Sequence, residues 1–233
     1  MENFYDRTQI LIGKDALKKL QETHITVLGV GGVGSWVCES LVRMGIGFIK
    51  IIDFDKIDVT NINRQIHALD STIGMSKVSV MRDRLLQINP AVHICTYEEK
   101  VEKIIYDDLF NETDYTIDCI DDVRAKVDVI KWHIEENKKI ISCMGTGNKI
   151  GIKPFQIKDI SKTSVCPLAR AIRIRLRKEG IYHGVPVLFS EELPNRAFAK
   201  ENSPTGTISY MPAMAGLELS KYVALEILKE FMK

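Results

Sequence analysis

The chain has 233 residues, 45% of them hydrophobic and 27% charged, and this balance excludes an intrinsically disordered protein. Its 32 Lys and Arg residues nearly balance 31 Asp and Glu residues, and the formal net charge of +1 excludes a protein that is basic over its whole surface. The 5 cysteines include no CxxC pair and charges interrupt every apolar stretch, so we expect a cytoplasmic protein with reduced thiols, no cysteine zinc cage and no membrane association.

Strand and helix patterns alternate up to residue 145. Runs rich in β-branched residues predict strands at 24–30, 48–54, 93–97, 115–120 and 139–144. Apolar stripes with helical spacing predict helices at 34–44, 76–88 and 123–136. This alternation predicts an α/β fold, a Rossmann-like, doubly wound and mainly parallel sheet with helices on both faces.

The pattern changes after Gly151. The sequence predicts an extended segment at 152–160, a basic helix at 167–179, a short strand at 185–191 and a long helix at 212–233. We interpret residues 151–233 as a C-terminal α+β elaboration of the same sheet, so that 1–233 form a single domain.

A glycine-rich turn follows the first predicted strand and opens the first predicted helix. It has the GxGxxG pattern, formed by Gly29, Gly31, Gly32 and Gly34. Such glycines permit a tight turn and let the backbone approach a phosphate, and the helix N-terminus offers N–H groups to an anion. Asp53 ends the next strand, where a carboxylate can accept hydrogen bonds from a ribose. Three interpretations remain open here: a nicotinamide-dependent oxidoreductase, a cofactor-bound regulator, and a turn that binds nothing.

Polar residues beyond the second strand argue against a dehydrogenase. Asn61, Arg64, Gln65 and Lys77 follow that strand, and Asp121 is predicted to end the fourth strand at the same sheet edge. Two cations beside a nucleotide suit a triphosphate, because negative charge develops as pyrophosphate leaves. A carboxylate at this edge could hold magnesium. The alternative for each residue alone is a solvated surface charge.

Read in order, these motifs resemble one known superfamily. The chain resembles the ThiF/MoeB/HesA superfamily, whose fold is that of the ubiquitin-activating enzymes. The resemblance is carried by these motifs in order: GxGGxGS, DxD, NxxRQ, Lys77 and DxxD. The resemblance covers residues 5–150 and implies a ThiF-type adenylation domain with its ATP-binding core at 1–150. It implies that a carboxylate is adenylated with ATP and Mg²⁺, and that pyrophosphate is released.

The resemblance also assigns roles to individual residues. It makes Arg64, Lys77 and Asp121 the catalytic residues, with Asp121 the magnesium carboxylate. Asp53 matches the ribose ligand, and Arg7 matches the residue that reaches across a homodimer into the partner's ATP site. The implied ATP contacts are Gly29, Gly31, Gly32, Gly34, Asp53, Asp55, Asn61, Arg64, Gln65, Lys77 and Arg7.

Within the superfamily, the missing CxxC pairs separate this chain from the sulfur-carrier adenylyltransferases. Residues 59–69, 163–169 and 206–223 instead resemble the tRNA threonylcarbamoyladenosine dehydratases. That resemblance implies ATP-dependent cyclisation of threonylcarbamoyladenosine next to the tRNA anticodon, through adenylation of the threonyl carboxylate. The alternative is an adenylyltransferase for the C-terminal carboxylate of a ubiquitin-like sulfur carrier. Some family members also use a monovalent cation or a sulfur-transfer partner protein.

Two cysteines near the predicted site need an interpretation. Some of the dehydratases have Asp directly before the Pro-Leu-Ala of their motif, where this chain has Cys166. A reactive thiol and a packed small hydrophobic side chain are both possible, and we favour packing, because nothing in the sequence fixes a base beside it. Cys143, in the fifth predicted strand, is interpreted in the same way.

The basic helix is the candidate tRNA contact. Residues 170–178 read RAIRIRLRK, with Arg170, Arg173 and Arg177 on one helical face and Lys178 beside them. No acid occurs among these residues, so pairing within the segment is unavailable and a contact with the tRNA backbone is predicted. The alternative is a solvated helix surface. The loop at 194–204 is expected to close over the site on RNA, and it contributes Arg196 and Lys200.

Overall fold

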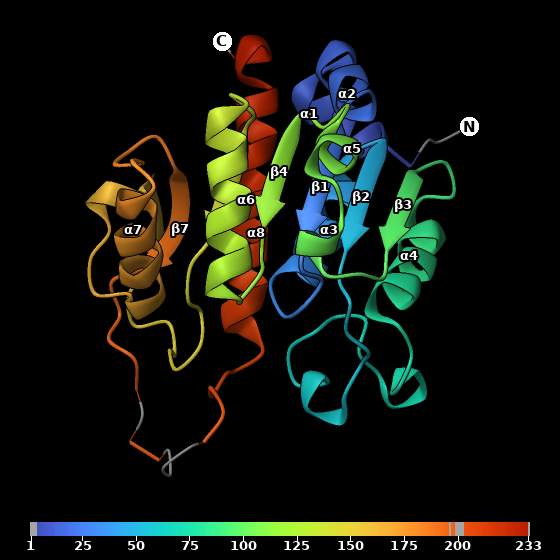
Figure 1. The fold of residues 1–233 in the computed structure, drawn as a ribbon. Coiled ribbons are helices and arrows are strands. Elements are labelled where there is room, and N and C mark those ends of the chain that lie inside the picture. The colour runs from blue at the N-terminus through green and yellow to red at the C-terminus, as the bar shows by residue number, and fades with distance from the viewer. Residues whose placement is uncertain (1–3, 196, 199–202, 233) are drawn as a thin grey trace.

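The computed structural model describes residues 4–195, 197–198 and 203–232, and they form one seven-stranded sheet (Figure 1). The strand order is β3-β2-β1-β4-β5-β7-β6. All neighbours are parallel except β6, which runs antiparallel to β7 at one edge. The strands are β1 (His24–Leu28), β2 (Phe48–Ile52), β3 (His93–Tyr97), β4 (Tyr115–Asp118), β5 (Ile140–Cys143), β6 (Phe155–Asp159) and β7 (Pro186–Ser190).

Helices cover both faces of the sheet, as the alternating sequence pattern predicts. One core packs α2, α3, α4 and α8 on one face, and the other packs α5, α6 and α7 on the opposite face. The helices are α1 (Asp6–Ile12), α2 (Lys14–Gln21), α3 (Gly34–Met44), α4 (Lys77–Ile88), α5 (Tyr106–Phe110), α6 (Val123–Glu135), α7 (Pro167–Lys178) and α8 (Tyr210–Ile227). The predicted Rossmann-like α/β fold is confirmed.

Burial along the strands follows their place in the sheet. β4 and β5 are buried at every residue, because helices cover both of their faces. The edge strands β3 and β6 are partly exposed and present charged or polar side chains such as His93 and Lys158 to solvent. Such residues keep a sheet edge from pairing with another chain.

The C-terminal helix packs closely against the beginning of α3. A Cβ atom at Gly216 in α8 would lie 2.7 Å from the Val33 carbonyl oxygen and 2.8 Å from the Trp36 Cβ. Glycine therefore lets the two helices approach to backbone contact. Since Val33 belongs to the glycine-rich turn, α8 supports that turn from the side of the sheet that α3 covers.

Several element boundaries differ from the prediction. The strands predicted at 24–30, 48–54 and 115–120 end two residues earlier, at Leu28, Ile52 and Asp118. After these points the chain turns away from the ladder, and Gly29 does so with φ +81°. The helix predicted at 212–233 spans Tyr210–Ile227 and includes Pro212, which the first turn of a helix tolerates. The helices α1, α2 and α5 were not predicted.

Candidate active site

A large cavity lies at the carboxyl ends of the strands, where the sheet order changes direction. The chain continues from β1 to β2 and β3 on one side, and to β4 and β5 on the other, which is the position where open α/β sheets bind ligands. The cavity has a volume of about 1040 Å³ and is lined by the segments that follow β1, β2, β4 and β5 and by the first turn of α7. The predicted residues that line it are Gly29, Gly31, Gly32, Asp53, Asp55, Asn61, Arg64, Gln65, Lys77 and Asp121.

The glycine turn brings backbone directly to the cavity wall. A Cβ atom at Gly29 would lie 3.0 Å from the Cys119 carbonyl oxygen, and one at Gly34 would lie 1.8 Å from the Gly29 carbonyl oxygen. Gly34 is therefore required for the turn itself and does not line the cavity. A Cβ atom at Gly31 would have its nearest neighbour at 3.9 Å, so the backbone there faces open space.

Asp53 connects the turn to the end of β2. Its two carboxylate oxygens accept hydrogen bonds from the backbone N–H of Val30 at 2.7 Å and of Asp55 at 2.9 Å. Burial raises the pKa of this carboxyl, and the charge of Lys77 with these two N–H groups acts in the opposite direction. A carboxylate has about four acceptor positions, so Asp53 can accept further hydrogen bonds from a ligand.

Two cations lie on the same wall. The Lys77 ammonium is 2.6 Å from an Asp55 carboxylate oxygen and 4.0 Å from Asp53, and the lysine is buried. The Arg64 guanidinium donates to the Thr60 carbonyl oxygen at 2.8 Å. Both side chains are thus held beside the glycine turn, in the arrangement that suits a polyphosphate.

Gln65 supplies an unsatisfied acceptor at this wall. Its side-chain amide oxygen is buried and has no hydrogen-bond partner among the described residues. Buried polar atoms are nearly always paired, so an orphan atom in a cavity wall indicates a ligand that pairs with it. The neighbouring Asn61 accepts from the Asp58 backbone N–H at 3.1 Å and closes the short helix over Val59–Asn61.

The carboxylates at and after the end of β4 have two different roles. Asp118 is structural, and Asp121 lines the cavity. The sequence places Asp121 at the end of the strand, which is wrong, because β4 ends at Asp118. The Asp118 carboxylate is fully buried, 2.7 Å from the Lys126 ammonium and 2.6 Å from the Ser142 hydroxyl. This pairing stops the strand residue from facing a ligand and leaves Asp121 in the exposed loop that lines the cavity.

The same loop does not supply enough ligands to bind a metal ion without a nucleotide. Asp122 caps α6 by accepting from the Ala125 backbone N–H at 2.8 Å. No group of three or more His, Cys, Asp or Glu side chains with metal-binding geometry occurs in the described part of the chain. Asp121 is a free carboxylate of the kind that joins phosphate oxygens around Mg²⁺, so the residues fit a metal that arrives with a nucleotide.

Comparison with known proteins assigns this architecture to a family. Residues 5–231 match the ThiF family. The chain belongs to the ThiF family. The prediction from the motif order is therefore confirmed, and the match extends over both halves of the chain.

The similarity to individual ThiF-family proteins is also full-length. The tRNA threonylcarbamoyladenosine dehydratase of Bacillus subtilis (strain 168) is 37% identical over 241 residues, which cover 97% of this chain and 95% of that protein. The crystal structure of the E. coli tRNA N6-threonylcarbamoyladenosine dehydratase in complex with ATP superposes with a TM-score of 0.89 at 32% identity, covering 97% of this chain and 94% of that one. The molybdopterin-synthase adenylyltransferase of E. coli is 32% identical over 52% of this chain.

The cavity has a second wall, of which the sequence indicated only the two cysteines. It is formed by the segment after β5 and the first turn of α7, with Cys143, Lys149 and Cys166 all buried. Burial raises the pKa of Cys143 to about 12, so this thiol stays protonated, in agreement with a packing role. Lys149 could not be predicted as a site residue, because a single lysine in a glycine-rich loop belongs to no periodic pattern and to no motif.

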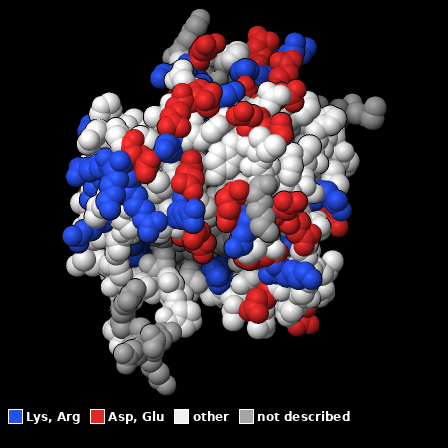
Figure 2. Space-filling view, viewed as in Figure 1, with Lys and Arg blue, Asp and Glu red and all other residues white. Residues whose placement is uncertain are grey.

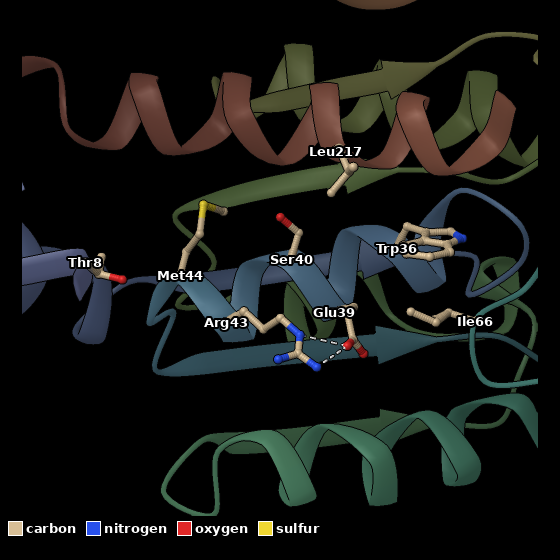
Figure 3. Close-up of a pocket in the computed structure, with 8 residues that line it drawn as sticks. All are labelled: Thr8, Trp36, Glu39, Ser40, Arg43, Met44, Ile66 and Leu217. Atoms are coloured by element: carbon tan, nitrogen blue, oxygen red, sulfur yellow. Dashed lines mark hydrogen bonds and ion pairs between the residues drawn. The ribbon is translucent and has the colours of Figure 1, made fainter. Parts of the chain in front are cut away.

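A smaller hollow of about 310 Å³ lies outside this cavity, between α1, α3 and α8 (Figure 3). Thr8 and Leu217 contribute from α1 and α8, and α3 contributes most of the rest. The buried Glu39 carboxylate beside it is paired with Arg43 at 2.8 Å and with Arg84 at 2.7 Å. Arg7 lies exposed on α1 and does not line the large cavity of its own chain.

The basic helix α7 forms a positive surface next to the large cavity (Figures 1 and 2). Arg170, Arg177 and Lys178 are exposed. Arg173 is partly buried, and its guanidinium donates to the Thr163 carbonyl oxygen at 3.1 Å. It therefore holds the segment before α7 in addition to any contact with RNA. Two further predicted cations lie outside the described residues, namely Arg196 and Lys200.

The described helices include none that is both long and apolar enough to cross a membrane.

Proposed function

We propose that this ThiF-family chain is an ATP-dependent tRNA threonylcarbamoyladenosine dehydratase. The observation that carries the proposal is the single cavity that gathers the glycine turn, Asp53, Arg64 and Lys77 in a chain similar over its full length to the B. subtilis dehydratase. The likeness to the sulfur-carrier type of adenylyltransferase covers about half of the chain, and the zinc-binding CxxC pairs are missing, which disfavours that alternative.

ATP would occupy the wall made by β1 and β2. The glycine turn and the N-terminus of α3 receive its phosphates, Asp53 accepts from the ribose, and the phosphate contacts are Asn61, Arg64, Gln65 and Lys77. The unpaired amide oxygen of Gln65 supports a ligand that donates a hydrogen bond at this wall, such as a ribose hydroxyl, while the amide NH₂ of the same side chain would donate to phosphate. Asp121 would hold Mg²⁺ with phosphate oxygens, and the ion would supply positive charge beside the leaving pyrophosphate.

The reaction has two chemical steps, each of which displaces a leaving group. A threonyl carboxylate oxygen attacks the α-phosphorus, an acyl-adenylate forms and pyrophosphate leaves, while Arg64 and Lys77 stabilise the charge that develops on it. A nucleophilic atom of the same threonylcarbamoyl group then attacks the activated carbonyl carbon, releases AMP and loses a proton. The net change in the nucleoside is the loss of one water. Because ring closure is intramolecular, the protein has to position the group more than to attack it.

The test of this function is direct. The protein is incubated with ATP, Mg²⁺ and tRNA that carries threonylcarbamoyladenosine, and the nucleosides are analysed by mass spectrometry. We expect a product lighter by one water that requires ATP. No such product, together with adenylation of a ubiquitin-like carrier protein, would establish the alternative.

The exposed basic side chains of α7 support a contact with the tRNA backbone. Reversing two of them, in the variant Arg170→Glu with Arg177→Glu, should weaken tRNA binding and lower the slope of log affinity against log salt by about two, one for each lost phosphate contact. Binding is measured by titration at several salt concentrations. The matched control reverses Lys14 and Lys19 on α2, which lies at the top of Figure 1 and away from α7. Equal slopes for both double variants would remove α7 from the RNA surface.

Exposed apolar side chains support a homodimer. Ile10 is 82% exposed and Leu11 is 84% exposed on α1, beside the hollow that contains Trp36 and Leu217. Apolar groups gathered in this way are typical of a protein–protein interface. In such a dimer Arg7 would be free to contact the partner's site. The monovalent cation and the sulfur-transfer partner stay predictions from the resemblance.

A further inference from the structure

The two walls of the large cavity differ in charge. The wall proposed for ATP contains Arg64 and Lys77, and several carboxylates among which are Asp53 and Asp121; Lys100 and Arg124 line the cavity on the same side as these carboxylates. The opposite wall is made from residues after β5, from the first turn of α7 and from Pro194, Thr205, Thr207 and Pro212. Among the described residues that line it, Lys149 is the one charged side chain.

Lys149 is held in place on both sides. Glu192, itself buried, accepts from the backbone N–H of Ile150 at 2.7 Å and of Gly151 at 3.0 Å. On the other side, the Asn148 backbone N–H donates to the Gly206 carbonyl oxygen at 2.7 Å. The lysine therefore lies in a loop whose backbone is fixed, which is what an organised binding group requires.

The ammonium group itself is incompletely paired. Lys149 is 3% exposed, and its Nζ donates to the Ser190 carbonyl oxygen at 3.1 Å. In the described part of the chain, no carboxylate lies within 4.0 Å of this nitrogen. The charge of Glu192 favours the ammonium from beyond that distance, while its oxygens accept from the backbone N–H groups of Ile150 and Gly151. A buried ammonium with three donors and one carbonyl partner is costly unless an anion joins it.

The chemistry of adenylation calls for a cation at this wall. The substrate carboxylate has to approach a triphosphate that is itself strongly negative, and the cations of the opposite wall are occupied by that triphosphate. A separate positive charge on the substrate side offsets the repulsion and orients the attacking oxygen. Lys149 is the described residue of this wall that meets the requirement.

We propose that the Lys149 ammonium binds the carboxylate that is adenylated, which makes Lys149 a catalytic residue of the substrate side. This assignment rests on the function proposed above, and it identifies the side chain that binds the carboxylate of the substrate. Burial lowers the pKa of Lys149, and an entering carboxylate counteracts this effect by adding a negative charge beside the ammonium.

The experiment pairs the lysine with the carboxylate that it is proposed to bind. Two anticodon hairpins are prepared, one with threonylcarbamoyladenosine and one with the carboxamide of that nucleoside. Their affinities are measured for the wild-type protein and for Lys149→Met, in the presence of a non-hydrolysable ATP analogue. We expect the wild type to bind the acid at least about tenfold more tightly than the amide, the range for a charge-assisted hydrogen bond, and Lys149→Met to bind both equally.

The matched control is Lys50→Met. Lys50 is half-buried in β2, and its ammonium also donates to backbone carbonyl oxygens, of Leu109 at 3.0 Å and Asn111 at 2.9 Å, but it does not line the cavity. This variant should keep the wild-type preference. Lys149→Gln, which removes the charge but keeps a donor for Ser190, provides a second variant in case the methionine does not fold. Binding of the ATP analogue should be unchanged in all folded variants.

The outcomes separate this inference from the proposed function. A preference for the acid that survives in Lys149→Met and Lys149→Gln, or that is absent from the wild type, overturns the role of Lys149 even when the wild type makes the cyclic nucleoside. A wild type that makes no cyclic nucleoside overturns the proposed function first. Loss of the preference in the Lys149 variants alone, with ATP binding intact, supports the assignment.

Discussion

Replacing Arg64 or Lys77 with alanine is expected to lower the rate of pyrophosphate release by about 10²–10³-fold, the loss seen when one group that stabilises developing charge is removed. Both side chains lie on the cavity wall beside the glycine turn, and Lys77 is held there at 2.6 Å from Asp55. In a buried site such a charge stabilises the departing pyrophosphate more strongly than it would in water.

The measurement is pyrophosphate release with threonylcarbamoyl-modified tRNA as the substrate, with thermal unfolding followed to verify the fold. Arg82→Ala is the matched control for Arg64→Ala, because Arg82 pairs with Asp83 on α4 and lines neither the large cavity nor the small hollow. Its activity should stay near that of the wild type. Full activity of both Arg64→Ala and Lys77→Ala would contradict the adenylation mechanism.

Replacing Lys126 with methionine is expected to lower the free energy of unfolding by about 3–5 kcal/mol, the range for breaking a buried ion pair from one side. Lys126 and Asp118 are both 0% exposed, and their charged atoms are 2.7 Å apart. Without the ammonium, the hydrogen-bond partners that the described residues leave to the Asp118 carboxylate are the Ser142 hydroxyl and the Ile120 backbone N–H. A buried charge with no counter-charge is strongly destabilising.

Urea unfolding measures this effect, and α6 supplies its own control. Lys131 is on the same helix, but it is partly exposed and pairs with Glu179 at the surface, so Lys131→Met should change stability far less. Adding Asp118→Leu to Lys126→Met should restore part of the stability, because the second change removes the unpaired charge. A Lys126→Met protein as stable as Lys131→Met would show that the pair contributes little.

The parts of the fold that depend on local spacing could be predicted from the sequence. Buried strands and the helices that alternate with them are encoded in apolar periodicity, and the glycine turn is encoded in residues that are neighbours in the chain. The helices α1 and α5 could not be predicted because they are short. In addition, α1 has no buried residue, so it shows no apolar stripe. Strand ends were misjudged where apolar residues such as Ile120 continue past the ladder.

The parts of the site that depend on contacts between distant segments could not be predicted. Lys126 on α6 and Ser142 on β5 bind the Asp118 carboxylate, and this leaves Asp121 to face the cavity. The sequence does not show that these two residues lie beside Asp118. Lys149 is brought to the cavity by its own hydrogen bond to Ser190 and by those of its neighbours Ile150 and Gly151 to Glu192, and each of these partners is more than forty residues away in the sequence. Arg173 shares a periodic face with Arg170, yet its contact with Thr163 gives it a different environment.

The packing of Gly216 against the beginning of α3 has a consequence for how the protein is made. A ribosome synthesises β1, the glycine turn and α3 before α8, which follows every strand of the sheet in the chain. Until then the side of α3 that α8 covers is exposed, and such exposed surface is prone to aggregate or to be bound by chaperones. The glycine turn is therefore made long before the helix that supports it, so the nucleotide site of a nascent chain is incomplete until α8 has emerged.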